Sequence, residues 1–96
     1  MAIKDPIINI SGVPFPVKFG YLSYSIFNGQ GYTLDQCANA EILLRLYHSA
    51  ILAGCQRNNV PELPWAEFMS KLDDDDNTEV FNELTKLYQT TNEAKK

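Results

Sequence analysis

The sequence contains one histidine and two cysteines, the side chains that most often serve as a base or a nucleophile. His48 lies between Cys37 and Cys55, and the apolar pattern predicts that all three stand on one helix. At 1.5 Å per residue, His48 would be roughly 16 Å from Cys37 and roughly 10 Å from Cys55, beyond hydrogen-bond reach in both cases. We therefore expect no catalytic dyad. We interpret His48 as a residue at the polar edge of an amphipathic helix.

The two cysteines also bear on the compartment. A continuous helix would separate Cys37 from Cys55 by about 27 Å, whereas a disulfide needs Cα atoms within ~7 Å. Two free thiols are typical of a reducing compartment. The segment Met1–Pro6 has no hydrophobic stretch of the signal-peptide type, and no apolar run approaches the ~20 residues of a membrane span. We expect a cytoplasmic protein without disulfides.

An acidic run invites a calcium hypothesis. Asp73, Asp75 and Asn77 would take the first, third and fifth ligand positions of an EF-hand loop. The sixth position is Thr78, where the loop needs glycine, and the twelfth is Leu84, where it needs a bidentate glutamate. We therefore interpret the run as the acidic entry of a helix, and we predict no metal site and no cofactor.

Phosphate and nucleic-acid binding are both disfavoured. Gly29 and Gly31 lack the following glycine or lysine with which phosphate-binding loops enter a helix. Twelve acidic against eight basic side chains give a net charge of −4, so the chain lacks the positive field that a phosphate backbone requires. Neither a loop nor a spacing of catalytic side chains favours an enzyme, and we predict a non-enzymatic protein.

The elements that position these residues are a hairpin and a set of helices. Two short apolar strands around Ser11-Gly12 predict a hairpin over about 7–19, and periodicities of three and four predict helices. The predicted helices cover about 20–28, 34–54, 64–72 and 77–89, with a frayed tail over 90–96. Ninety-six residues fit a single domain, 1–96. The predicted fold class is α+β, mainly α, with the hairpin packed on a compact bundle of about four helices, because two strands alone bury too little.

The helices have predicted faces. Phe19, Leu22 and Ile26 should share one face of the first helix, with Tyr24 and Phe27 beside it. A Thr33 to Gln36 capping box should start the second. The second helix has the most regular stripe in the chain, which comprises Leu43, Leu46, Tyr47, Ala50, Ile51 and Gly54.

Two apolar residues of the second helix lie outside this stripe. With Leu43 placed at 0°, Leu52 falls near 180° and Ile42 near 260° on a helical projection. A second contact surface, within the molecule or between subunits, would explain both. Ile42 and Leu52 are therefore the candidate partner-binding residues.

With these elements placed, the chain resembles the small tail assembly chaperones of long-tailed bacteriophages and prophages. The resemblance rests on Ile8–Gly12 followed by Phe15–Tyr21, which reads Phe-Pro-Val-Lys-Phe-Gly-Tyr. It extends to the helix end Phe27-Asn28-Gly29 and to Ala50–Gly54, which closes the leucine-rich helix. Pro14 departs from the family pattern and predicts an edge strand, because proline cannot donate to a β-ladder.

The resemblance implies a binding role without catalysis. Members bind the tape measure protein, keep its helical segments soluble in the bacterial host cytoplasm and help to recruit tail tube protein, often as homo-oligomers. Many also have a longer form made by ribosomal frameshifting, for which the codons of Lys95-Lys96 could supply a slippery site. The alternative is a small helical regulatory or adaptor protein of phage or bacterial origin, although Arg45 is the only basic residue of the apolar stretch of the second helix.

Overall fold

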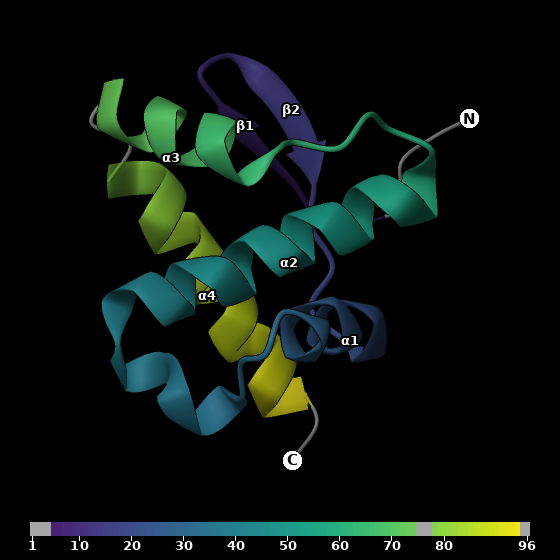
Figure 1. Cartoon of the computed structure of the whole chain (residues 1–96). Coiled ribbons are helices and arrows are strands. Elements are labelled where there is room, and N and C mark those ends of the chain that lie inside the picture. The colour runs from purple at the N-terminus through teal and green to yellow at the C-terminus, as the bar shows by residue number, and fades with distance from the viewer. Residues whose placement is uncertain (1–4, 75–77, 95–96) are drawn as a thin grey trace.

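The computed structural model describes residues 5–74 and 78–94 and places a two-stranded hairpin among four α-helices (Figure 1). The strands are β1 (Ile7–Ile10) and β2 (Val13–Pro16), and the helices are α1 (Tyr21–Gly29), the 3₁₀ helix η1 (Leu34–Ala38), α2 (Ala40–Asn58), α3 (Trp65–Asp74) and α4 (Thr78–Ala94). The α+β, mainly α, fold class is confirmed. The predictions for Asp75, Asp76, Asn77, Lys95 and Lys96 concern positions outside the described residues.

The hairpin forms at the predicted turn. Ser11 and Gly12 both have positive φ, 52° and 81°, as the two central residues of a type I′ turn require. The register pairs Ile10 with Val13 and continues antiparallel to Ile7 opposite Pro16. The returning strand β2 is shorter than the predicted hairpin, which extends to 19, because the chain beyond Pro16 turns away to cross α2.

The prolines of β2 sit where the ladder needs no donor. The Val17 N–H donates to the Pro6 carbonyl at 2.8 Å, and bonded pairs alternate along an antiparallel ladder. The Ile8 and Phe15 pair is therefore bonded, whereas Pro14 and Pro16 occupy the unbonded positions. Their nitrogens face the outer edge of β2, so neither proline costs the hairpin a hydrogen bond.

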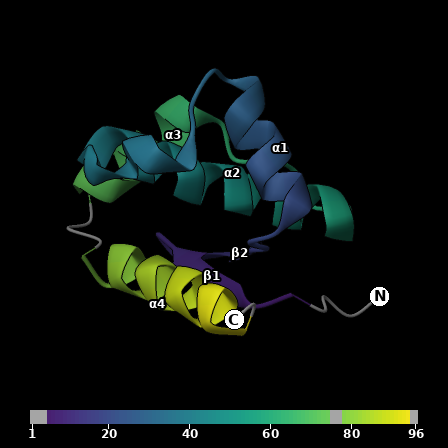
Figure 2. The same cartoon turned by 90° about the horizontal axis from the view of Figure 1, so that it is seen from below.

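The elements form layers around the hairpin. Figure 2 shows α4 on one side of β1 and β2, and α1, α2 and α3 on the other. Apolar side chains from all these parts meet in one core. Its buried members include Ile8, Ile10, Phe15, Phe27, Leu46, Tyr47, Ile51, Phe68 and Leu84. The hairpin thus packs Ile8, Ile10 and Phe15 into the core, which gives two strands the helical cover they need, while Ile7 and Asn9 stay exposed.

The hairpin meets α2 through an unusually close backbone contact. A Cβ placed on Gly54 would lie 2.1 Å from the Pro16 carbonyl oxygen. One turn earlier, the Ala50 carbonyl accepts a hydrogen bond from the Lys18 N–H at 3.0 Å. Only a residue without a side chain lets the strand approach the helix in this way. We call this contact, made by Pro16, Val17, Lys18, Ala50 and Gly54, the β2–α2 joint.

The buried face of α1 differs from the prediction. Leu22 is exposed and Ile26 is half-buried, whereas Ser23 and Phe27 are buried. Ser23 sets this orientation, because its hydroxyl donates to the Gly20 carbonyl and accepts from the Gly20 N–H, both at 2.8 Å. Such reciprocal bonds fix the first turn of a helix. Phe27 then turns inward and stacks on Tyr32.

The predicted helix over 34–54 is wrong at its start. Thr33 and Gln36 do pair, but they start only the short η1, and Asn39 then adopts an extended conformation. The Asn39 side chain accepts from the N–H groups of Glu41 and Ile42 at 2.9 and 3.3 Å and thereby caps a new helix. Two adjacent capping signals therefore divide one apolar pattern between η1 and α2.

At its other end α2 continues past Gly54. Asn59 ends the helix in the left-handed conformation, with φ of 55°. Asp5 stabilises the last turn of α2, because its carboxylate accepts hydrogen bonds from Arg57 Nε and from Asn58 Nδ2, at 2.9 Å each. Gly54 therefore packs α2 against β2 and does not end the helix. Asp5, in the N-terminal segment, stabilises the helix end.

The last two helices complete the core. Phe68 of α3 and Val80 and Leu84 of α4 are buried, as their stripes predict. The Tyr47 hydroxyl lies 2.8 Å from Thr85 Oγ1 and links α2 to α4. α4 extends to Ala94, past the predicted helix end at 89. Thr90 contributes by bonding its hydroxyl to the Lys86 carbonyl.

Candidate functional site

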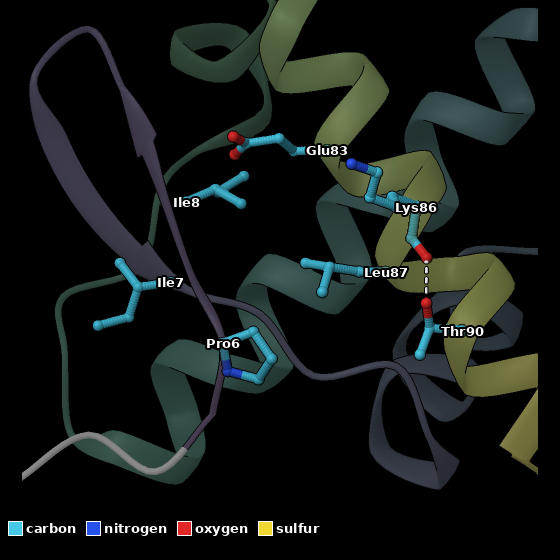
Figure 3. Close-up of a pocket in the computed structure, with 7 residues that line it drawn as sticks. All are labelled: Pro6, Ile7, Ile8, Glu83, Lys86, Leu87 and Thr90. Carbon is cyan, nitrogen blue, oxygen red and sulfur yellow. Dashed lines mark hydrogen bonds between the residues drawn. The ribbon is translucent and has the colours of Figure 1, made fainter.

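A groove of about 310 Å³ runs between β1 and α4 (Figure 3). The strand side of the groove is made by Pro6, Ile7 and Ile8, and the helix side by Glu83, Lys86, Leu87 and Thr90. A second hollow of about 190 Å³ adjoins it at Glu83 and is lined by Asn9, Glu79, Val80 and Glu83. The two hollows share Glu83, and together they lie beside β1 from Ile7 to Asn9.

The sequence shapes this groove through two periodicities. Along β1 the side chains alternate, so Ile8 is buried while Ile7 is 46% exposed. Along α4 the buried residues Val80 and Leu84 lie one turn apart. Leu87 is half-buried beside them, and the flanking positions 79, 83, 86 and 90 are exposed and polar. The groove consequently has an apolar floor and a charged rim.

The chemistry of the groove suits binding. Its described lining offers two carboxylates, one ammonium group, hydroxyl and amide groups, and the outer edge of a strand. These groups recognise charge and backbone hydrogen-bonding groups. In Figure 3 the side chains of Glu83 and Lys86 come from the same helix and border the open space beside β1. We treat this groove as the candidate functional site.

The residues singled out from the sequence lie elsewhere. Ile42 stands in the first turn of α2, half-buried against the core. Leu52 is half-buried ten residues further along the same helix. This separation corresponds to roughly 15 Å along the axis, so the two do not adjoin on α2. Sequence reasoning missed the β1–α4 groove, because the exposure of Ile7 and the return of α4 beside β1 are seen only in the fold.

His48 is buried, and the polar-edge interpretation is wrong. Only 4% of the residue is exposed, and Nε2 lies 2.6 Å from the Leu63 carbonyl, to which it must donate. The ring stacks on Phe68 and meets Trp65 edge-on. α3 and the segment before it therefore cover the side of α2 that the sequence pattern assigns to solvent.

Charge around His48 is arranged to keep it neutral. Burial lowers its pKa most, the bond to Leu63 opposes that, Arg45 lowers it further and Glu62 raises it. The Arg45 guanidinium lies 3.7 Å from the centre of the Trp65 ring, a cation–π contact. His48 Nδ1 is buried without a hydrogen-bond partner among the residues that the structure describes. Its neutral Nε2–H form thus holds α3 on α2.

Both cysteines are free thiols, Cys37 in η1 and Cys55 in α2. The expected common helix does not exist, because Asn39 interrupts it. Burial raises the pKa of Cys37, with a further contribution from Asp35, and burial likewise raises the pKa of Cys55. Raised pKa values leave little thiolate and hence little nucleophilicity. Within residues 5–74 and 78–94, no group of three or more His, Cys, Asp or Glu side chains could hold a metal ion.

Comparisons with known proteins return no match: no family model, no curated protein and no solved structure is similar to this chain. Among the described residues, none of the helices combines the length and apolar character needed to cross a membrane.

Proposed function

We propose that this chain is a small, non-enzymatic tail assembly chaperone of a bacteriophage or prophage. In this role it binds the tape measure protein in the bacterial host cytoplasm and helps to recruit tail tube protein. The proposal starts from the sequence resemblance over Phe15–Tyr21 and Ala50–Gly54. The fold supplies an observation that supports it, because these two segments meet in space.

That observation is the β2–α2 joint. Pro16 and Lys18 belong to the first segment of the resemblance, and Ala50 and Gly54 belong to the second. The Gly54 position tolerates no side chain beside Pro16, and Ala50 accepts the Lys18 N–H. Similar residues at both ends of one packing contact favour a shared fold over a chance likeness of two short patterns.

Apolar side chains on the helices give such a chaperone its binding surface. Tyr21 is 91% exposed at the start of α1, and Leu22 beside it is also exposed. Leu34 on η1 is exposed, and Leu52 on α2 is half-buried. An amphipathic helix of a partner can bury its apolar face against residues of this kind. The long helical segments of a tape measure protein fit that chemistry.

Co-expression with a tape measure protein from the same genome tests the proposal. We expect the partner to become soluble and to elute with this chain from a sizing column. Leu52→Asp serves as the surface variant and Glu67→Lys, on the exposed side of α3, as the control. A tape measure protein that stays insoluble with the parent chain would overturn the assignment.

A further inference from the structure

The outer edge of β1 presents backbone groups that the hairpin leaves unused. Bonded pairs alternate along the ladder, so the N–H and C=O groups of Ile7 and Asn9 point away from β2. On the opposite edge, Pro14 and Pro16 have no N–H, and Gly54 packs against the Pro16 carbonyl. Natural sheets block edges with prolines, charges or covering helices. The edge of β2 has such blocks, whereas β1 has unused donors and acceptors on the side of α4.

The β1–α4 groove lies beside this edge. The hollows of about 310 and 190 Å³ lie along β1, with α4 as their other wall. Leu87 provides half-buried apolar surface in it, whereas Ile8 is only 2% exposed and the exposed Ile7 side chain points away from α4 (Figure 3). β1 is four residues long, so an added strand of four residues, about 13 Å in length, would match it.

The charges beside the groove determine which kind of segment can bind in it. Glu79 and Glu83 lie one helical turn apart on α4 and flank Asn9. Both carboxylates are exposed, so each remains available to an incoming cation. The whole chain carries a net charge of −4, which attracts a basic segment and repels a second copy of itself. Lys86 lies toward the Pro6 end, so the acidic character is concentrated at the Asn9 end.

We propose that the groove between β1 and α4 binds an extended, basic segment of a partner protein as an added strand. The segment pairs with Ile7 and Asn9, places a Lys or Arg side chain over Glu79 and Glu83, and packs an apolar side chain against Leu87. Strand addition gains affinity from backbone bonds and specificity from the alternate side chains. This interaction does not depend on the tail-chaperone proposal and would hold for any partner of this chemistry.

Peptide binding tests the proposal directly. The probe is an end-blocked, fluorescent peptide of alternating valine and threonine with two lysines, titrated with the full chain and followed by anisotropy. One comparison peptide has glutamate in place of lysine, and another has N-methylated backbone nitrogens at alternate residues. We expect binding of the lysine peptide and about tenfold weaker binding of both comparison peptides, in line with the loss of a charge-assisted or backbone hydrogen bond.

Two variants place the peptide in the groove. Glu83→Lys should reverse the preference between the lysine and glutamate peptides, whereas the control Glu67→Lys on α3 should leave it unchanged. Asn9→Pro removes one donor from the outer edge and should weaken binding about tenfold without lowering the melting temperature, because this N–H makes no ladder bond. If Asn9→Pro does not fold, the N-methylated peptide and Glu83→Lys decide the matter.

Several outcomes would overturn the proposal. Equal binding of the lysine and glutamate peptides would remove the charge argument. A helical circular dichroism signal in the bound peptide would exclude strand addition. A dimer in light scattering that Asn9→Pro abolishes, together with no peptide binding, would make a second copy of the chain the occupant instead.

Discussion

The two edges of the hairpin are treated differently by the helices beside them. On the β2 side, the Pro16 carbonyl lies so close to α2 that position 54 admits only glycine, and Lys18 donates to the Ala50 carbonyl at 3.0 Å. On the β1 side, α4 leaves a groove of about 310 Å³. One edge is therefore closed by backbone contact, and the other remains open.

The residues at each edge explain the difference. Small side chains on α2, Ala50 and Gly54, let the backbone of the strand approach the helix, and proline removes donors that would otherwise remain unpaired. On α4 the corresponding positions beside β1 are long and charged, with Glu83 and Lys86 at the rim. The stability of the hairpin should thus depend on the β2–α2 joint, while the exposed residues at the rim of the β1–α4 groove can vary with little effect on folding.

Gly54→Ala should break the closed edge. The added methyl would meet the Pro16 carbonyl oxygen at 2.1 Å and Val17 N at 2.8 Å, and neither backbone atom can move without displacing the strand. We expect a loss of about 4 kcal/mol or more in the free energy of unfolding, measured by urea denaturation. Alanine is otherwise the better helix former, so helix propensity alone predicts the opposite sign.

Gly29→Ala is the matched control for this variant. It lies in the last turn of α1, where an added Cβ would meet nothing within 4 Å. The change should leave stability equal or raise it by about 0.5 kcal/mol, through lower entropy of the unfolded chain. Equal effects of the two alanines would contradict the idea that the β2–α2 joint needs glycine.

Neighbouring isoleucines of β1 separate the core from the groove. Ile8→Ala removes a side chain that is 2% exposed and should cost about 3 kcal/mol. Ile7→Ala removes one that is 46% exposed and should cost less than about 0.5 kcal/mol. Thermal unfolding of both variants measures the difference. A large loss for Ile7→Ala would mean that the open edge is part of the core.

Local signals in the sequence predicted the closed edge better than the open one. Ser11-Gly12 predicts the turn because few residue pairs accept positive φ at both positions. The stripe from Leu46 to Gly54 predicts the buried face of α2, because its period belongs to the helix itself. Both features depend on residues close together in sequence, which makes them readable without knowledge of the fold.

The features that sequence reasoning missed depend on distant contacts. A helical projection assigns His48 to solvent because it cannot show that α3 returns to cover it. The break at Asn39 is an exception, because it follows from a second local cap six residues after the Thr33 cap. The β1–α4 groove forms between segments some seventy residues apart. Partner binding at Ile42 and Leu52 remains a prediction. The β1–α4 groove is a second candidate site on a different part of the molecule.

His48 offers a pH test of the closed side of the molecule. Burial lowers its pKa from the ordinary value of 6.5, so the unfolded chain takes up a proton more readily than the folded one. Stability should therefore fall as the pH drops below about 6.5, and the loss should continue down to the lowered pKa of the folded state.

Urea denaturation of the parent chain and of His48→Phe between pH 7.5 and 5 measures this effect. The variant leaves the Leu63 carbonyl without its bond and should cost about 2 kcal/mol at neutral pH. It should also lose the dependence on pH in this range. Parallel pH profiles for the two proteins would show that another group titrates.

Asp5→Asn tests the smallest of these effects, the attachment of the N-terminal segment to α2. The Asp5 carboxylate accepts from Arg57 and Asn58, and although burial alone would raise its pKa, these bonds and the charge of Arg57 lower it overall. A lowered pKa means that the carboxylate contributes stability above about pH 3.8 and loses it as the pH falls through the folded value. We expect a cost of about 1 kcal/mol at pH 7, reduced by salt because Arg57 is 47% exposed.

The change should leave peptide affinity at the β1–α4 groove unaltered, because Asp5 holds the end of α2 and does not line the groove. A variant that unfolds normally but binds peptide differently would show that the two sides of the hairpin are coupled through the segment that leads into β1.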